Sequence, residues 1–297
     1  MFHKPVMLQE TVNSLEIKKN GIYIDLTFGG GGHSKEILQR INNDGRVIAF
    51  DHDQSAINNI IHDSRFMLLK QNFIYLKQNL SYLKISKVDG ILADLGVSSF
   101  QFDSLDRGFS FEEDSNLDMR MNKESNVNAI DILNNYSESE LANIFFNYSD
   151  LTNSRKIAKI IIEKRKGNKV QSSNDLNKIL SVLTNPGYDN KFLARVYQAI
   201  RIEVNQEIKN LKQLLNQIPN LLIKNGLVSI ITYHSVEDRL VKRFFKNNCF
   251  NNEPNKDDFG NKVLSIKPKS NFIKPTEIEI KSNPRARSAK LRTAIKL

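Results

Sequence analysis

The sequence predicts an α/β domain built on a parallel sheet, interrupted after its fourth strand by a helical insertion. Two observations predict this fold. Short apolar runs alternate with amphipathic helical patterns through the first hundred residues, with 20–25 residues from one strand to the next, and such alternation is typical of βαβ units. The alternation stops at about residue 105 and resumes at residue 206. We therefore expect a discontinuous domain over 1–104 and 206–297, and an inserted domain over 105–205.

Five apolar runs are the candidate strands of the sheet. They lie at 21–27, 46–51, 66–69, 88–94 and 226–232. Helical patterns with one apolar face fill the intervals, at 34–41, 54–61, 73–83 and 206–222. The tail alternates in hydrophobicity at 263–266 and 291–297, which indicates antiparallel edge strands, and the Pro-, Asn- and Lys-rich stretch 251–276 is expected to be loop.

The insertion is expected to be helical throughout. Apolar residues recur at helical spacing in four segments, at 129–133, 138–146, 154–165 and 175–183. No part of 105–205 has a convincing strand pattern. The sheet is therefore expected to come entirely from the two flanking segments.

Composition excludes several classes of protein. With 40% hydrophobic and 26% charged residues, the 297-residue chain has the composition of a globular protein with a core. No apolar run approaches the length of a membrane helix, and the first residues lack the pattern of a signal peptide. A single cysteine, Cys249, excludes a disulfide framework and a Cys-cluster zinc site. We expect a cytoplasmic protein with no membrane segment and no metal.

The net charge of +10 is concentrated in two stretches. Segments 155–169 and 281–297 each carry a local charge of +6, whereas 101–150 carries −8. Concentrated basic stretches favour an anion-binding face, such as one for RNA, although AT-rich coding would also enrich lysine. The cations that we assign to RNA binding from these stretches are Arg155, Lys156, Lys159, Arg285 and Arg287.

A glycine cluster follows the first candidate strand. Residues Asp25–Ser34 read Asp-Leu-Thr-Phe-Gly-Gly-Gly-Gly-His-Ser, and a helical pattern begins there. Glycines let a backbone approach a ligand closely, and a helix N-terminus offers free N–H groups. The lysine of a P-loop is missing, and the third glycine of a dinucleotide fingerprint would fall on Ser34 or Lys35. The remaining pattern, Asp-x-Thr-x-Gly-x-Gly, resembles motif I of the class I S-adenosylmethionine methyltransferases.

Three further residues bear on this cofactor. Asp51 ends the second strand 22 residues after Gly29, where a carboxylate can accept hydrogen bonds from both ribose hydroxyls. Phe73 opens the helix after the third strand and either flanks an adenine ring or belongs to the core. Asp53 is either a helix cap or a ligand. The glycine cluster together with Asp51 indicates an adenosyl cofactor.

The fourth candidate strand ends at Asp94 and opens a polar loop that runs to Gln101. In an open α/β sheet, ligands bind at the carboxyl ends of the strands. Asp94 is therefore a candidate for the chemistry, and its alternative is a structural cap. His234 and Asp238 follow the fifth strand and reach the same edge. The alternative for His234 is a structural residue at a strand end, and for Asp238 a first-turn acid favoured by the helix dipole.

Taken together, the motifs of this chain resemble those of the RsmH (MraW) family. The matching segments are long, occur in order and span nearly the whole sequence, at 3–10, 25–34, 94–101, 107–111, 117–121, 198–201 with Asn205, 233–239 and 283–289. The chain departs from the family pattern at Ser115-Asn116, at Ser149–Leu151 and at Lys191–Leu193. The last two departures lie in the insertion, so they concern its RNA contacts more than the cofactor site.

The resemblance implies a class I methyltransferase domain with a helical insertion that recognises RNA. It implies methylation of N4 of a P-site cytosine in 16S ribosomal RNA (position 1402 in the usual rRNA numbering) within the small ribosomal subunit, with S-adenosylmethionine as the methyl donor. The cofactor contacts that it carries over are Gly31, Gly32, His33, Asp51, Phe73, Asp94 and Gln101. The oligomeric state stays open, a homodimer included.

A cytosine amino group is a poor nucleophile, so we expect the enzyme to act mainly by positioning it. Asp94 or a nearby carbonyl is expected to accept a hydrogen bond from N4–H as positive charge builds, while His234 and Asp238 frame the base. Arg285 and Arg287 hold phosphates or position the loop 233–239, and Arg201 is a further candidate RNA contact. Two alternatives are a methyltransferase of another amine or nucleic acid, and an RNA-binding protein without catalysis.

Overall fold

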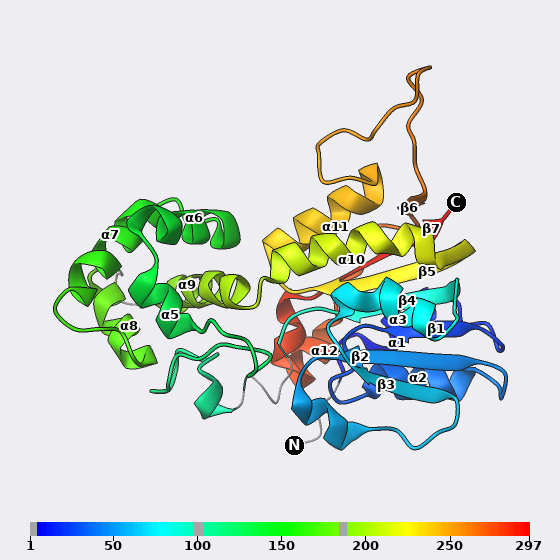
Figure 1. Cartoon of the computed structure of the whole chain (residues 1–297), viewed down its shortest axis with the longest axis horizontal. Coiled ribbons are helices and arrows are strands. Elements are labelled where there is room, and N and C mark those ends of the chain that lie inside the picture. Colours follow the sequence, from blue (N-terminus) through cyan, green and yellow to red (C-terminus); the bar gives the residue numbers. More distant parts are fainter. Residues whose placement is uncertain (1–4, 98–101, 103, 184–188) are drawn as a thin grey trace. The chain divides into compact units, whose positions relative to one another are not determined.

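The computed structural model describes residues 5–97, 102, 104–183 and 189–297 (Figure 1). The chain divides into two compact units. Met1–Gly96 and Lys209–Leu297 form the first, which we call the sheet unit, and Val97–Ile208 form the second, the insertion unit. The boundaries of the insertion unit thus lie at 96/97 and 208/209, a few residues outside the 104/105 and 205/206 predicted from the sequence. Among the described residues, no helix has the length and apolar character needed to span a membrane.

The sheet unit contains a seven-stranded mixed sheet, which confirms the predicted α/β fold. In chain order its strands are β1 (Ile22–Asp25), β2 (Arg46–Asp51), β3 (Phe66–Lys70), β4 (Val88–Asp94), β5 (Leu222–Thr232), β6 (Ile266–Pro268) and β7 (Lys290–Lys296). The spatial order is β3-β2-β1-β4-β5-β7-β6. Strands β1 to β5 pair in parallel, and β7 runs antiparallel to both β5 and β6. The strand order therefore reverses between β1 and β4, and ligands bind at such a reversal.

The prediction of two antiparallel edge strands in the tail is wrong for one of them. Strand β7 lies between β5 and β6, so it is an interior strand. Strand β6 is the edge strand, and it begins at Ile266, where the expected run 263–266 ends. Hydrophobic alternation identifies a strand with one buried face, but it does not specify which strands flank it.

Helices cover both faces of this sheet. They are α1 (Leu8–Ser14), α2 (Gly32–Arg40), α3 (Leu76–Tyr82), α10 (Glu207–Leu221), α11 (Ser235–Asn247) and α12 (Glu277–Ser282). Apolar side chains of α1 and α2 share one buried cluster with β1 and β2. Those of α3, α10 and α11 share the larger cluster on the other face with β4 and β5. Each face is thus closed by helices, and the ends of the strands are left for ligands.

One predicted helix, over 54–61, is only a 3₁₀ helix, η1 (Gln54–Asn59). The Asp53 side chain accepts a hydrogen bond from the Ser55 N–H and starts the turn, so Asp53 acts as the cap that the sequence allowed. Ile57 and Ile60 stay 38% and 44% exposed, so the segment buries too little apolar surface to stabilise an α-helix. The helix predicted over 73–83 begins as a 3₁₀ turn, η2 (Phe73–Tyr75), and continues as α3.

The insertion unit is helical and has its own apolar core. Its helices are η3 (Leu105–Arg107), α5 (Ala129–Asn135), α6 (Glu138–Ser149), α7 (Ser154–Arg165), α8 (Ser173–Leu180), η4 (Ser181–Leu183) and α9 (Asp189–Val204). Capping boxes start α5, α6 and α8, each with a Ser or Asn at the N-cap and an acid three residues later. Since each cap is a local signal, the starts of these helices are fixed within the sequence itself.

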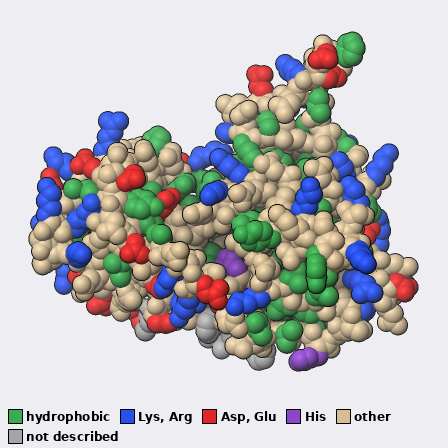
Figure 2. All heavy atoms as spheres, viewed as in Figure 1, with side chains coloured by type: hydrophobic (Ala, Val, Ile, Leu, Met, Phe, Trp, Pro, Cys, Tyr) green, Lys and Arg blue, Asp and Glu red, His purple; other side chains and the backbone are tan. Residues whose placement is uncertain are grey.

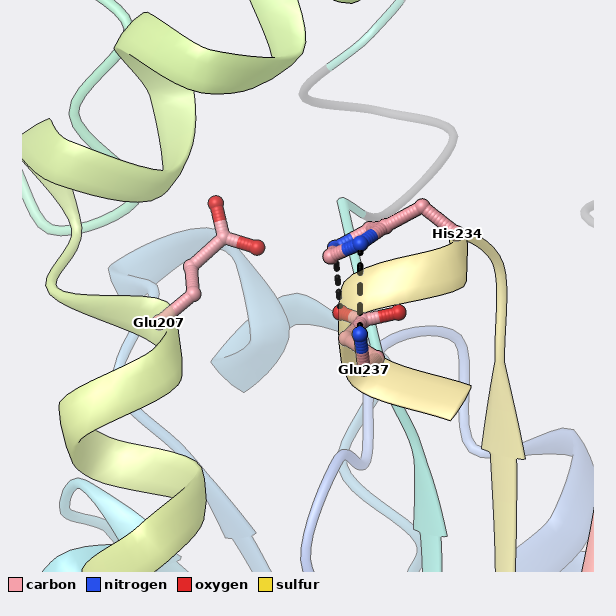
Figure 3. Close-up of side chains that lie close together, drawn as sticks. All are labelled: Glu207, His234 and Glu237. Atoms are coloured by element: carbon pink, nitrogen blue, oxygen red, sulfur yellow. Dashed lines mark hydrogen bonds and ion pairs between the residues drawn. The ribbon is translucent and has the colours of Figure 1, made fainter. Parts of the chain in front are cut away.

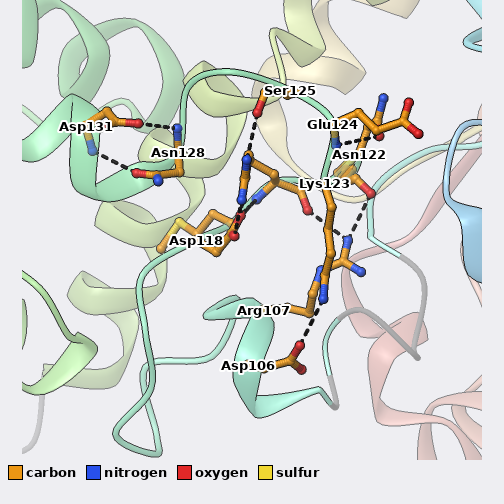
Figure 4. Close-up of polar contacts among 12 residues, drawn as sticks. Asp106, Arg107, Asp118, Asn122, Lys123, Glu124, Ser125, Asn128 and Asp131 are labelled. Carbon is orange, nitrogen blue, oxygen red and sulfur yellow. Dashed lines mark hydrogen bonds and ion pairs between the residues drawn. The ribbon is translucent and has the colours of Figure 1, made fainter.

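The motifs 107–111 and 117–121 form an internal scaffold of the insertion unit (Figure 4). The buried Arg107 side chain donates from Nη2 to the carbonyl oxygens of Arg120 (2.8 Å) and Met121 (2.9 Å). Arg120 in turn pairs with Asp118 through two hydrogen bonds of 2.7 Å. The two motifs are therefore held together by arginines that bond within the protein.

Candidate cofactor and substrate site

The glycine cluster lies where β1 ends and α2 begins, at the edge formed by the carboxyl ends of the parallel strands (the carboxyl edge). Gly29 and Gly31 have φ angles of +50° and +76°, which favour glycine. A Cβ on Gly31 would lie 2.8 Å from the Phe28 ring, so this position is packed. A Cβ on Gly32 would lie 2.2 Å from Pro5 Cγ. Packing of Phe28 and Pro5 thus explains the missing side chains at Gly31 and Gly32.

Gly29 differs from its neighbours because its backbone borders open space. A Cβ there would meet no described atom within 4 Å. Its N–H donates to Asp51 Oδ2 at 2.8 Å, which brings the loop after β1 next to the end of β2. Its carbonyl oxygen accepts a hydrogen bond from Asn59 Nδ2 at 3.0 Å. The loop therefore offers a surface of fixed backbone without a side chain beside a carboxylate, and this arrangement fits an adenosyl cofactor.

Asp51 is held in place by backbone groups. Besides Gly29, it accepts a hydrogen bond from the Asp53 N–H through Oδ1 at 2.9 Å. Burial raises the pKa of the Asp51 carboxyl, and these two N–H groups oppose the rise. A carboxylate has about four acceptor positions, so two N–H donors leave capacity for ribose hydroxyls. Asp51 thus has the position and the acceptor capacity predicted for a cofactor ligand.

Two other predicted cofactor residues have structural contacts of their own. Phe73 is half-buried and packs against the larger core cluster, in agreement with the core alternative. His33 is buried in the first turn of α2, and its Nε2 lies 3.2 Å from the Val6 carbonyl oxygen. Cofactor contact by either stays a prediction. Gln101, the remaining predicted cofactor residue, lies outside the described residues.

Asp94 ends β4 and is bound from the neighbouring strand. The Tyr233 hydroxyl, directly after β5, donates to Asp94 Oδ1 at 2.6 Å, and the Asp94 N–H donates to Thr27 Oγ1 at 2.6 Å. Burial raises the pKa of Asp94 to about 6, while the charge of His33 and the Tyr233 hydrogen bond oppose the rise. Asp94 is therefore mainly ionised at neutral pH, and within the described part of the chain no donor competes for Oδ2 with a substrate.

A second buried carboxyl, Asp25, lies at the end of β1. It accepts hydrogen bonds from Ser34 Oγ (2.7 Å) and from the Thr27 N–H (3.1 Å). Burial raises its pKa to about 6, and its charge contributes to the rise at Asp94. Two acids with raised pKa values at adjacent strand ends are typical of a functional site.

His234 is the N-cap of α11 (Figure 3). Its Nδ1 accepts from the Glu237 N–H at 3.4 Å, and its Nε2 lies 3.1 Å from Glu237 Oε1. Glu237 also accepts from the Tyr233 N–H at 3.0 Å. The His234 side chain is only 7% exposed. The structural alternative for His234 is thus present as a helix cap, and its contact with a base stays a prediction.

Asp238 connects α11 to β7. Its carboxylate accepts hydrogen bonds from Arg292 Nε (2.6 Å) and Lys290 Nζ (3.0 Å). Burial acts to raise the pKa of Asp238, but the hydrogen bonds from Arg292 and Lys290 bring it below its ordinary value. Both carboxylate oxygens of Asp238 therefore accept hydrogen bonds from cations. Contact of Asp238 with a base stays a prediction, and Asp238 would position the base while it is bound to Arg292 and Lys290.

A cavity of about 360 Å³ opens beside these residues. Its walls include Tyr233, His234 and Asp238 together with three cations, Lys274, Arg287 and Lys290. Arg287 belongs to η5 (Pro284–Ser288) and is exposed, as is Arg285. Cations next to the candidate base site are suited to a phosphate group.

The predicted RNA contacts in the insertion unit fall into two groups. Arg155, Lys156 and Lys159 are exposed on α7, and Figure 2 shows Lys and Arg side chains around this helix. Arg201 is different because its guanidinium pairs with Glu207 through two hydrogen bonds of 2.9 Å. Contact of Arg201 with RNA stays a prediction, but a carboxylate already engages its guanidinium.

Sequence reasoning missed three residues of this site: Tyr233, Glu237 and Asp25. Tyr233 and Asp25 lie at the ends of β5 and β1, and that position was the signal that identified Asp51 and Asp94. From the sequence, Tyr233 was assigned to the motif 233–239, but no hydrogen-bond partner was predicted for it. Its bond to Asp94 spans 139 residues, so it required the strand order.

Comparisons with known proteins agree with this geometry. A model of the MraW methylase family matches residues 1–297. A protein of Christiangramia forsetii named ribosomal RNA small subunit methyltransferase H is 50% identical over 296 residues, covering 100% of this chain and 98% of that one. The protein of the same name in Flavobacterium johnsoniae is 48% identical, with the same coverage.

Solved structures are more distant. The crystal structure of an rRNA methylase from Streptococcus thermophilus aligns with a TM-score of 0.44 at 10% identity, over 99% of this chain and 98% of that one. The family model matches every residue of this chain, and the two relatives named above are 50% and 48% identical to it. The chain belongs to the MraW methylase family, and it has the S-adenosylmethionine-dependent methyltransferase fold that its sequence predicts.

Proposed function

We propose that this protein transfers a methyl group from S-adenosylmethionine to N4 of a P-site cytosine in 16S rRNA of the small ribosomal subunit. The names of its relatives support the ribosomal substrate, and the resemblance of its motifs supports the base and the atom. The observation that carries the proposal is the Asp94–Tyr233 pair at the carboxyl edge, next to the glycine loop. We also propose that the protein acts in the cytoplasm.

The cofactor supplies an electrophilic methyl group on a positively charged sulfur. In this proposal the backbone at Gly29 lies against the cofactor, and Asp51 accepts hydrogen bonds from its ribose. The open space at Gly29 and the spare acceptor capacity of Asp51 support these assignments. Gly31, Gly32 and His33 shape the loop, and Phe73 is proposed to flank the adenine.

Asp94 is proposed to orient the amino group. The lone pair of N4 is delocalised into the ring, so attack requires the amine to lose conjugation as positive charge builds on nitrogen. A carboxylate that accepts the N4–H hydrogen bond stabilises this charge. Tyr233 holds Asp94 Oδ1, which fixes the carboxylate and keeps Oδ2 for the amine. Because the pKa of Asp94 is about 6, the acceptor form dominates at pH 7 and above.

Cations of each unit are proposed to hold the RNA. Arg287, with Lys274 in the same cavity, would bind a phosphate near the target nucleotide, and Arg285 a neighbouring one. His234 would contact the base from the rim of this cavity. On the insertion unit, the exposed cations Arg155, Lys156 and Lys159 would contact the RNA backbone. To reach the carboxyl edge, the base has to leave its stack.

Methyl transfer from labelled cofactor to purified small subunits, followed by mass analysis of the nucleosides, tests this proposal. The expected product is N4-methylcytidine at a single site. An Asp94→Asn variant should bind the cofactor and lose at least tenfold in single-turnover rate, since it keeps the shape but not the charge. Label in another nucleoside would refute the N4 assignment. Cofactor binding without transfer to any RNA would favour a non-catalytic RNA-binding protein.

A further inference from the structure

Helix α11 carries a row of cations outside the two basic stretches of the sequence. They lie at spacings of three and four residues, which brings them to one face of the helix, and they are Arg239, Lys242, Arg243 and Lys246. The opposite face is apolar, and Val241, Phe244 and Phe245 are buried there. The row is therefore held on the surface by the packing of the helix that carries it.

These cations line a groove of about 210 Å³. Its walls are formed by Arg239, Lys242, Arg243, Lys246, Asn247 and Asn252. The described lining thus contains four cations and two amides and has no carboxylate. Such a lining donates hydrogen bonds and repels positive charge, so an anion is the ligand that it suits.

Hydrogen bonds fix one wall of the groove, and two of its lysines have no ion pair with any described carboxylate. Asn247 Nδ2 donates to the carbonyl oxygens of Asn251 (3.0 Å) and Asn252 (2.8 Å), which holds the loop after α11 against the helix. Arg243 Nη1 donates to the Phe250 carbonyl oxygen at 3.1 Å. Lys242 and Lys246 are exposed, and within the described part of the chain no carboxylate forms an ion pair with either. Their charges are therefore available to a ligand.

We infer that this groove binds the phosphodiester backbone of the RNA beside the target nucleotide. The inference rests on the proposed function. His234 is the N-cap of α11, and a rise of about 1.5 Å per residue puts Arg239 and Lys246 about 8 and 18 Å along the helix from it. The four cations thus extend over about 10 Å in a line. A linear polyanion matches such a row, because positively charged grooves follow the backbone of a single strand.

The groove is separate from the cavity that contains Arg287. The two share no lining residue, and the cavity borders the N-terminus of α11 whereas the groove lies along its later turns. The phosphate proposed at Arg287 would be close to the flipped base, and those in the groove would belong to nucleotides further along the strand. Loss of the groove should therefore weaken binding of RNA and leave the rate of transfer in the bound complex unchanged.

The experiment compares wild type with a Lys242→Gln/Lys246→Gln variant of the full chain. Binding to a 16S rRNA fragment that contains the target is measured over a series of salt concentrations. The slope of log K against log salt should become less steep by about 1.4, because each phosphate contact on a single strand contributes about 0.7. Cofactor affinity and the single-turnover rate at saturating RNA should match wild type. A Lys242→Arg/Lys246→Arg variant should restore the wild-type slope.

The matched control is Lys19→Gln/Lys35→Gln, which removes two exposed lysines near α1 and α2 on the other face of the sheet. Its slope should equal that of wild type. A slope for Lys242→Gln/Lys246→Gln equal to that of the control would overturn the inference. The slopes are measured whether or not methyl transfer occurs. Failure of wild type to methylate cytosine would instead overturn the proposed function, so the two failures are distinguishable.

Discussion

The hydrogen bond from Tyr233 to Asp94 makes a specific prediction about pH dependence. The phenol donates to Asp94 Oδ1 at 2.6 Å. Burial, followed by the Asp94 carboxylate, raises the pKa of Tyr233 well above its ordinary value, so it remains a donor throughout the working range. A Tyr233→Phe variant keeps the ring that packs near Gly96 and removes only the donor. We expect the pKa of Asp94 to rise in this variant.

The size of the rise follows from the bond that is lost. A hydrogen bond to a charged group contributes about 1.5–3 kcal/mol, and one pKa unit corresponds to about 1.4 kcal/mol. Removing it should raise the pKa of Asp94 from about 6 to about 7–8. At pH 7 the ionised fraction then falls by about twofold to tenfold, whereas at pH 9 nearly all of the carboxyl is ionised in both proteins.

Single-turnover methyl transfer at saturating cofactor and RNA, measured from pH 5.5 to 9, is the assay. The rate should fall on the acid side with a midpoint near 6 in wild type and one to two units higher in Tyr233→Phe, and the two rates should converge at high pH. Tyr82→Phe is the control, since Tyr82 is 87% exposed. An unmoved midpoint, with cofactor affinity intact, would refute the assignment of Asp94 as the acceptor.

Three further predictions concern the same edge of the sheet. Gly29→Ala should weaken cofactor binding at least tenfold by calorimetry, because its Cβ projects into the open space proposed for the cofactor. Both glycines have left-handed backbone, so each alanine should lower stability by about 1–2 kcal/mol, and Gly31→Ala should lose more because of the nearby ring. Normal cofactor binding by Gly29→Ala would contradict the fit of the loop. Asp25 has its pKa raised to about 6 in the folded state, above its unfolded value, so its contribution to stability is complete below about pH 4 and is lost as pH rises through 6. Between pH 4.5 and 7.5 this loss should amount to about 2 kcal/mol, and Asp25→Asn should remove it. Urea unfolding curves at the two pH values check this, and equal pH dependences of wild type and variant would be the contrary result. Asp238→Asn should lower the free energy of unfolding by about 1–3 kcal/mol at pH 7. Because the pKa of Asp238 is lowered in the folded state, the difference in stability between wild type and variant should shrink as pH falls through that pKa. An equal difference at pH 3 and pH 7 would disprove the ion pair with Arg292.

The elements whose bounds were predicted best are those with local signals. The predicted bounds of β2 (46–51), β4 (88–94) and α7 (154–165) agree with the structure, because each is an apolar or amphipathic run with clear ends. The place of β7 between β5 and β6 could not be predicted in this way. It depends on backbone hydrogen bonds between segments that are distant in the sequence.

The candidate site shows the same division. Asp51 and Asp94 were identified because an acid that directly follows an apolar strand reaches the carboxyl edge. The partners of Asp94 and Arg201 were not identified, since Tyr233 and Glu207 meet them only in the folded chain. The cations of α11 were overlooked for another reason. Acids close by in the sequence, such as Glu237 and Asp238, partly cancel these positive charges when the charge is summed over a segment. The cations are seen to form a separate row only when the residues are placed on the helix.

The interior position of β7 has a consequence for how the chain folds. Val228 and Ala294, which are paired across β5 and β7, are both fully buried, so β7 contributes to the core of the sheet unit. Among the described residues, the strand that pairs with β6 is β7, so β6 has no strand partner until β7 is made. During synthesis the insertion unit is complete long before that point, and it has a core of its own. Closure of the sheet joins segments that are far apart in the sequence, so it should be slow and should follow formation of the insertion unit.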